Sequence, residues 1–261
     1  VKIIKSWLPN FLRQNDDELK DNYKDIRKKM IIAALLHDIG KTGPEVDIQG
    51  EKINPSVNKD FVLLFSIFEK RKIEEGGKNL SECSIREAIE RHIPREDQER
   101  VMDSIQKIPI PGSQQTFDLD KNKMKDIFGS HVEFSLEILQ KYEKRGEWQP
   151  DPLIILLISK HHKFGNNYNY EPHEEFYDLL PDNMKAFNDR LATLIELADM
   201  YQAMSSRGTQ RDALSTLEKI EQKFIDITAT KPESIPKYVF DMIAKLKNDE
   251  VIIQDLEEMK K

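Results

Sequence analysis

Several kinds of residue and segment are scarce in this chain of 261 residues. Its single cysteine, Cys83, excludes an internal disulfide framework and is typical of a reducing compartment. The longest apolar run, Leu153–Ile158, is far shorter than the roughly 20 residues needed to span a bilayer. No segment has the charged start, apolar middle and small-residue cleavage site of a signal peptide. We therefore expect a cytoplasmic protein that does not bind membranes.

An excess of positive charge is also missing. The chain carries 40 basic and 47 acidic residues, which gives a net charge of −7 at pH 7. Because DNA-binding surfaces need basic side chains to neutralise phosphates, this balance argues against DNA binding. It leaves room for a small phosphorylated ligand held by a few local cations. The chain begins at Val1 rather than at methionine, so we expect it to be part of a longer protein.

Strand signals are missing as well, and helical patterns take their place. The chain has only ten glycines and no sustained alternation of β-branched and polar residues. Met30–Leu36 is apolar nearly all round, which predicts a buried helix with Gly40 as the capping residue just past its end. Asp151 and Pro152 predict the N-cap and first turn of a second buried helix. A third helix is predicted over about 184–204, with an inner face of Phe187, Leu191, Leu194, Ile195 and Ala198.

The sequence therefore predicts an all-α fold organised as one helical bundle. Its core would comprise about 1–48 and 113–230, and residues 231–261 would add C-terminal helices. The stretch 49–112 contains four prolines and short amphipathic segments, which indicates an insertion between two core helices. A lid over a pocket and an elaboration of the packing are both open as its role. The helices expected in the insertion and near the C-terminal end are Phe61–Lys70, Ile85–Ile93, Glu99–Ile108, Leu214–Ile227 and Lys237–Leu246.

Imidazole and carboxylate groups occur at or inside the apolar helices, where charged side chains are rare unless they are paired or bind a metal. The pair His37–Asp38 ends the first buried helix, and the pair His161–His162 ends the second. His131 lies early in a further helix, and Asp199 lies inside the third. If these helices pack as a bundle, the side chains can converge on one point.

This mixture of nitrogen and oxygen donors suits divalent iron, manganese, zinc or nickel. One centre could use His37, Asp38 and Asp199 and keep open positions for water. A second centre could use His131 and the pair His161–His162, with Asp38 bridging the two ions. Two ions about 3.5–4 Å apart would clamp a phosphoryl group and hold a nucleophilic hydroxide at neutral pH.

Each of these groups also has an ordinary structural explanation. The pair His161–His162 could be a polar cap, because protonated imidazole is favoured at a helix C-terminus. His131 could be a helix-terminal histidine, and Asp199 could be an exposed acid of an amphipathic helix. Ile195 and Ala203 lie four residues away from Asp199 on either side, which indicates that its side chain points inward.

The motifs, taken in order, resemble a known family. Residues 37–41 (HDIGK) resemble the signature of the HD superfamily of metal-dependent phosphohydrolases. His131 with Ile138–Leu139, the pair His161–His162 and the stretch 198–214 look like successive motifs of its HD-GYP branch. The resemblance implies an HD-domain helical bundle that hydrolyses a cyclic dinucleotide, cyclic di-GMP, through a metal-bound hydroxide. It also implies two or three divalent metal ions, most often iron or manganese, with zinc, nickel and magnesium as alternatives.

Carried over residue by residue, the resemblance implies a role for each matching position. Asp38 and Lys41 would be catalytic, and Lys41 would also contact the phosphate. Arg207 and Arg211 would bind the substrate through a phosphate or a guanine edge, or lie solvated at a helix end. The implied substrate is a small phosphorylated nucleotide. An N-terminal sensor domain or a second copy of the chain are the expected partners. The implied metal ligands are His37, Asp38, His131, His161, His162 and Asp199.

The chain also departs from the family pattern. Lys163 stands where the family has glutamate after the histidine pair, and residues 164–168 replace the glycine-tyrosine-proline loop. The family places a further ligand upstream of the His–Asp pair, and no histidine precedes His37. Two alternatives to a cyclic dinucleotide phosphodiesterase therefore stay open. One is a phosphohydrolase of another nucleotide, and the other is a regulatory module that binds a ligand or partner without turnover.

Overall fold

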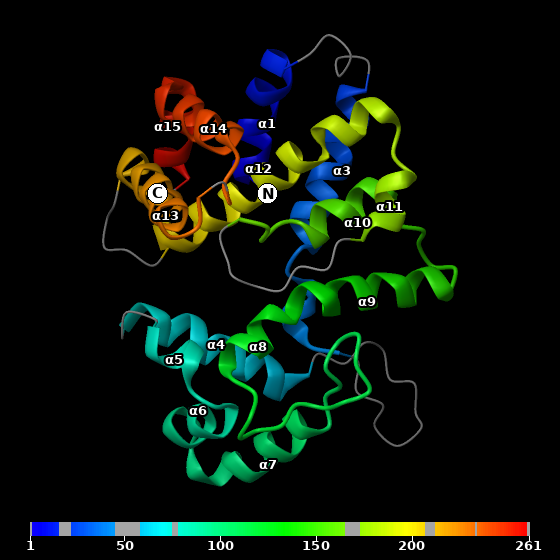
Figure 1. Ribbon diagram of the computed structural model, residues 1–261, viewed down its shortest axis with the longest axis vertical. Coiled ribbons are helices and arrows are strands. Elements are labelled where there is room, and N and C mark those ends of the chain that lie inside the picture. Colours follow the sequence, from blue (N-terminus) through cyan, green and yellow to red (C-terminus); the bar gives the residue numbers. More distant parts are fainter. Residues whose placement is uncertain are drawn as a thin grey trace. The chain divides into compact units, whose positions relative to one another are not determined.

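A computed structural model describes residues 2–15, 22–44, 58–74, 78–164, 173–206, 212–232 and 234–259. Within these ranges, strand pairing is limited to two isolated bridges, Ser84 with Lys123 and Pro109 with Thr116. The predicted all-α fold is confirmed. The helices, with η1 a 3₁₀ helix, are α1 (Lys2–Asn15), α3 (Tyr23–Leu36), η1 (Ile39–Thr42), α4 (Lys59–Glu74), α5 (Lys78–Glu82), α6 (Ile85–His92), α7 (Arg95–Gln106), α8 (Met124–Gly129), α9 (His131–Lys144), α10 (Pro152–Ser159), α11 (Glu174–Asp178), α12 (Asp182–Ser206), α13 (Ala213–Thr230), α14 (Lys237–Asn248) and α15 (Glu250–Glu258) (Figure 1).

The chain divides into two compact units. The first unit comprises Val1–His37 and Pro150–Lys261, and the second comprises Asp38–Gln149. One boundary falls on the peptide bond between two candidate ligands, His37 and Asp38. The predicted division into core, insertion and C-terminal helices uses other boundaries and stays a prediction.

In the first unit, α10 packs against α3, α11 and α12. The Asp151 side chain accepts a hydrogen bond of 2.9 Å from the backbone N–H of Leu153, and Pro152 occupies the first turn, as predicted. The same carboxylate lies 2.8 Å from Nζ of Lys29 on α3, which ties the start of α10 to its neighbour. All residues from Leu153 to Ser159 are buried, because a helix that is apolar on every side needs packing partners on every side.

The long helix α12 confirms the prediction for the third helix. The five residues predicted for its inner face are all buried, and α12 packs against α1, α10, α13 and α14. Near its end, Tyr201 lies edge-on to Trp7 of α1, with ring centroids 6.0 Å apart. The helix also buries three polar side chains, Asn188, Thr193 and Glu196. It therefore brings polar groups into the interior of the first unit.

In the second unit, η1 packs against α4 and α9. Aromatic rings join these helices and α8. The ring centroids of Phe61 and Phe134 lie 5.5 Å apart, and those of Phe65 and Phe128 lie 4.8 Å apart. The three helices predicted within 49–112 correspond to α4, α6 and α7, and residues 45–57 and 75–77 lie outside the described part of the chain.

The prediction for Gly40 is wrong. Helix α3 ends at Leu36 with His37 as its C-cap, and Gly40 lies inside η1 rather than at a helix end. A Cβ atom at Gly40 would lie 1.9 Å from the carbonyl oxygen of His131 and 2.5 Å from the nitrogen of Ser135. Glycine is therefore required by the close approach of η1 to α9, and its N–H donates a hydrogen bond of 2.8 Å to Oγ of Ser135.

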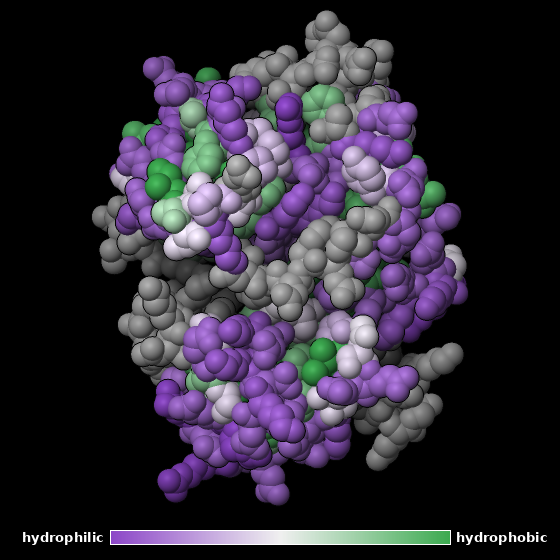
Figure 2. All heavy atoms as spheres, in the orientation of Figure 1, coloured by the Kyte–Doolittle hydropathy of each residue, from purple (hydrophilic) through white to green (hydrophobic). Residues whose placement is uncertain are grey.

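Figure 2 shows how hydrophilic and hydrophobic residues are distributed over one face of the described residues. On the face drawn in Figure 2, hydrophilic residues cover most of the coloured surface, and hydrophobic residues form small separate patches. Exposed apolar side chains such as Leu35, Leu179 and Val251 come from different parts of the chain. No helix in the described ranges combines the length and the apolar character needed to cross a membrane.

Candidate functional site

Four of the predicted site residues lie together in the first unit. His37 is the C-cap of α3, the pair His161–His162 lies in the turn that follows α10, and Asp199 lies inside α12. Nε2 of His37 is 3.7 Å from Oδ1 of Asp199. The ring centroids of His37 and His161 are 4.9 Å apart, and those of His161 and His162 are 4.0 Å apart.

Three further predicted residues lie together in the second unit. Asp38 precedes η1, Lys41 lies on η1, and His131 is the first residue of α9. Oδ1 of Asp38 is 3.4 Å from Nε2 of His131, and its Oδ2 accepts a hydrogen bond of 2.7 Å from Nζ of Lys41. The close approach at Gly40 sets this geometry, because it fixes η1 against the first turn of α9.

Three histidines, His37, His131 and His161, share one arrangement. In each, Nδ1 contacts the backbone carbonyl oxygen of the residue three positions earlier, at 3.1, 2.5 and 2.5 Å, respectively. A carbonyl oxygen can only accept a hydrogen bond, so Nδ1 must carry the proton and donate. In the neutral ring, Nε2 then presents a lone pair, which is the form that coordinates a metal ion.

The distances from Nε2 to the nearby carboxylates fit shared coordination better than direct hydrogen bonding. The values of 3.7 Å for His37 with Asp199 and 3.4 Å for His131 with Asp38 exceed ordinary hydrogen-bond lengths. Two donors bound at about 2.1 Å to one ion lie about 3.0–3.4 Å from each other. The distance for His131 with Asp38 falls at the end of this range, and the distance for His37 with Asp199 lies slightly above it. The structure thus contains histidine and aspartate groups close enough together to hold a metal ion.

Burial differs between the two kinds of donor. His131 is 2% exposed and His161 is 0% exposed, so their rings are held on all sides by the fold. The carboxylate side chains of Asp38 and Asp199 are 28% and 25% exposed. The imidazoles of His131 and His161 are therefore fixed in place, and the two carboxylates are partly open to solvent.

Glu196 is a residue of this region that the sequence reasoning missed. It is buried on α12, and its two carboxylate oxygens accept hydrogen bonds of 3.1 and 3.2 Å from the backbone N–H of Phe164. Burial lowers the pKa of Lys223 on α13, although the negative charges of Glu196 and Asp199 act to raise it. The signal for Glu196 was its position three residues before Asp199, which places both on one face of a helix.

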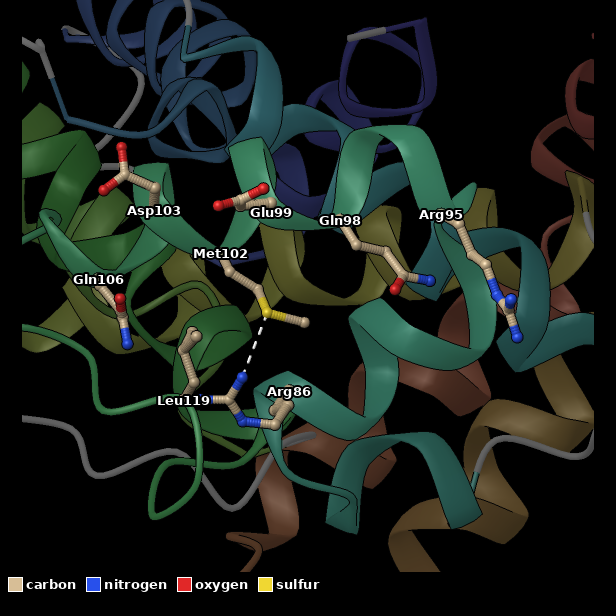
Figure 3. A pocket seen from close by; sticks show the side chains of 8 residues that line it. All are labelled: Arg86, Arg95, Gln98, Glu99, Met102, Asp103, Gln106 and Leu119. Carbon is tan, nitrogen blue, oxygen red and sulfur yellow. Dashed lines mark hydrogen bonds between the residues drawn. The ribbon is translucent and has the colours of Figure 1, made fainter.

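Two predicted substrate-binding residues, Arg207 and Arg211, lie outside the described residues, and so do residues 165–168 of the altered loop. A cleft of about 410 Å³ in the second unit contains none of the predicted site residues (Figure 3). In it, the Arg86 guanidinium lies 3.3 Å from the sulfur of Met102 and is held from the other side by Asp120. The cleft is lined by Arg86, Arg95, Gln98, Glu99, Met102, Asp103, Gln106 and Leu119.

Comparison with known proteins gives no independent identification. No protein-family model matches the chain, and neither a curated protein nor a solved structure matches it. The resemblance to the HD superfamily therefore rests on the sequence motifs alone. The physical argument for a function rests on the histidine and aspartate groups.

Proposed function

We propose that this protein is a metal-dependent phosphodiesterase that hydrolyses a cyclic dinucleotide, with cyclic di-GMP as the first candidate substrate. The observation that carries the metal-dependent part is the shared arrangement of His37, His131 and His161. Each has Nδ1 on a backbone carbonyl, which leaves Nε2 as the coordinating atom. The choice of substrate rests on the order of the sequence motifs. A cytoplasmic location is part of the proposal, on the ground of the single cysteine.

Two divalent ions, iron or manganese first and zinc, nickel or magnesium as alternatives, would be held by these groups. In the first unit the ligands would be His37, Asp199 and the pair His161–His162, and in the second unit they would be Asp38 and His131. Such ions lower the pKa of a water molecule and stabilise the charge that develops in phosphoryl transfer. Nitrogen and oxygen donors without thiolate suit these metals.

The chain's own side chains have separate tasks in the proposed reaction. Asp38 uses Oδ2 to hold the Lys41 ammonium at 2.7 Å, while its Oδ1 faces His131. The Lys41 ammonium is proposed to contact a phosphate oxygen of the substrate, because it is a hydrogen-bond donor of positive charge. The Lys41 side chain is 29% exposed, which gives a substrate access to it. Arg207 and Arg211 are proposed to bind the remaining phosphate or a guanine edge.

Metal binding and turnover test the proposal together. The purified protein would be stripped of metal and titrated with manganese, iron(II) and zinc. Each loaded form would then be assayed on cyclic di-GMP, on nucleoside mono- and triphosphates, and on a linear dinucleotide. We expect bound metal near two ions per chain and the highest turnover on the cyclic dinucleotide.

A matched pair of variants distinguishes the effect of losing a candidate site residue from the effect of losing one negative charge elsewhere in the same unit. Asp38→Asn removes the charge at the candidate site, and Asp103→Asn removes a charge from an exposed position of the same unit, where Asp103 pairs with Lys107. Asp38→Asn should lower turnover by at least about 100-fold, and Asp103→Asn should leave it unchanged. Higher turnover on a mononucleotide would replace the proposed substrate. Bound metal without any turnover would reject the enzyme, and no bound metal would reject the metal centre.

A further inference from the structure

One carboxylate of α12 contacts both ends of the turn that carries the histidine pair. Oδ1 of Asp189 accepts a hydrogen bond of 2.7 Å from Nζ of Lys160, and its Oδ2 accepts one of 2.8 Å from Nζ of Lys163. These two lysines are the residues immediately before His161 and immediately after His162. The pair of imidazoles therefore lies between two side chains that share a single counter-ion.

We propose that Asp189 is a positioning residue for the metal centre, and that it acts by fixing the turn 160–163 to α12. The inference rests on the proposed role of the pair His161–His162 as metal ligands. Asp189 does not touch the imidazoles. It acts on them only through Lys160 and Lys163.

The local backbone explains why this turn needs an anchor. Helix α10 ends at Ser159, and Lys160 is its C-cap, so the histidine pair lies beyond the last helical hydrogen bonds. Other contacts also hold the turn, among them Nδ1 of His161 on the carbonyl of Ile158 and Glu196 on the N–H of Phe164. Asp189 adds a side-chain link at each end, which restricts how far the two rings can rotate.

Charge gives Asp189 a second role. Two ammonium groups beside the histidines would repel a divalent ion, and the carboxylate of Asp189 offsets them. The Lys160 side chain is only 11% exposed and lies over the ring of Tyr177 at 5.3 Å, so it needs a partner of opposite charge. Burial raises the pKa of Asp189, but its hydrogen bonds to Lys160 and Lys163 outweigh this and the pKa is lowered. Asp189 is therefore ionised at neutral pH.

Manganese affinity of matched variants tests the inference. Asp189→Asn removes the charge that links the two lysines. Asp182→Asn removes a charge in the first turn of the same helix, where the side chain is 99% exposed and lies 3.3 Å from Lys185. We expect the manganese dissociation constant to rise about 10- to 100-fold in Asp189→Asn and to stay at the wild-type value in Asp182→Asn.

A double variant, Lys160→Met/Asp189→Met, tests the same role in a protein that is expected to fold even if Asp189→Asn does not. It removes the ion pair between Lys160 and Asp189 without leaving a buried charge, and such replacements of ion pairs are often neutral for stability. We expect it to fold, as judged by circular dichroism, and to bind manganese about 10- to 100-fold more weakly than wild type. Wild-type affinity in both Asp189 variants would overturn the positioning role.

A spectroscopic readout separates failure of this inference from failure of the proposed function. In metal-free protein labelled with ¹⁵N-histidine, we expect wild-type His161 to give the signals of a single tautomer with the proton on Nδ1. The Asp189 variants should give averaged or mixed tautomer signals for the histidine pair. If wild type binds no metal, the proposed function fails. The tautomer signals still decide then whether Asp189 positions the rings, and unchanged signals would overturn that role.

Discussion

The close approach of η1 to α9 gives a sharp prediction for Gly40→Ala. The added Cβ atom would lie 1.9 Å from the carbonyl oxygen of His131 and 2.8 Å from Oγ of Ser135. Carbon and backbone oxygen atoms do not come closer than about 3 Å, so the two elements must separate by about 1 Å. Because the two shortest contacts are with backbone atoms, the carbonyl oxygen of His131 and the nitrogen of Ser135, side-chain rotation cannot relieve the clash.

The expected cost follows from what that separation breaks. The hydrogen bond of 2.8 Å from the Gly40 N–H to Ser135 is lost, which costs about 1 kcal/mol. Forcing extra volume into packed structure costs about 1–3 kcal/mol more. We therefore expect Gly40→Ala to lower the free energy of unfolding by about 2–4 kcal/mol. The same separation moves Asp38 away from His131, so manganese affinity should fall as well.

Urea unfolding followed by circular dichroism measures this cost. Gly112→Ala is the matched control, because Gly112 belongs to the same unit and a Cβ atom there meets nothing within 4 Å. Its positive φ of 70° predicts a cost of only about 1 kcal/mol. Ser135→Ala, which removes the hydroxyl but leaves the approach intact, should also cost about 1 kcal/mol. A Gly40→Ala protein no less stable than Gly112→Ala would refute the argument from close approach.

Two further predictions concern the first unit. Asp151→Ala removes the N-cap of α10 and one of the two carboxylates that pair with Lys29. It should lower the free energy of unfolding by about 1 kcal/mol in urea titrations, with Asp182→Ala as an unaffected control. Burial raises the pKa of Tyr201 from 10.0 to about 12, with smaller contributions from two nearby acids. Since the folded pKa lies above the unfolded value, this contribution is fully present below pH 10 and is lost as the pH rises towards 12. Tyr201→Phe should therefore flatten the fall in stability between pH 10 and 12, and an unchanged fall would contradict the assignment.

The helices could be predicted where one local signal was strong. The Asp151–Pro152 start of α10 and the inner face of α12 depend on capping chemistry and on the helical period, and both are confirmed. C-terminal helices were predicted over 231–261, but the bounds of α15 within that range were not, although Asp249 caps it by accepting from two backbone N–H groups. Its apolar pattern is short, and the preceding helix α14 ends only at Asn248, so the boundary is set by the cap rather than by a change of composition.

Gly40 shows a different limit of sequence reasoning. A glycine just after an apolar helix is compatible both with a helix cap and with close packing, and the sequence does not distinguish them. The choice depends on Ser135, which lies 95 residues away and accepts the Gly40 hydrogen bond. Asp189 and Glu196 were missed for the same reason. Their partners are side-chain and backbone groups of the turn after α10. The spacing of Glu196 from Asp199 places both on one face of α12, but it does not identify these partners.

The three histidines lie just beyond helix ends, and this position explains how the local sequence can orient their rings. The last four carbonyl groups of a helix have no partner within that helix. His37 follows α3 by one residue, His131 follows α8 by two, and His161 follows α10 by two. Nδ1 of each ring donates a hydrogen bond to a carbonyl oxygen of the helix that precedes it. This bond gives a partner to a carbonyl group at the helix end and points Nε2 away from the backbone. The end of an apolar helix thus holds both the tautomer and the direction of a histidine placed just beyond it. A histidine at this spacing from a helix end is therefore held in the tautomer that the proposed metal centre needs.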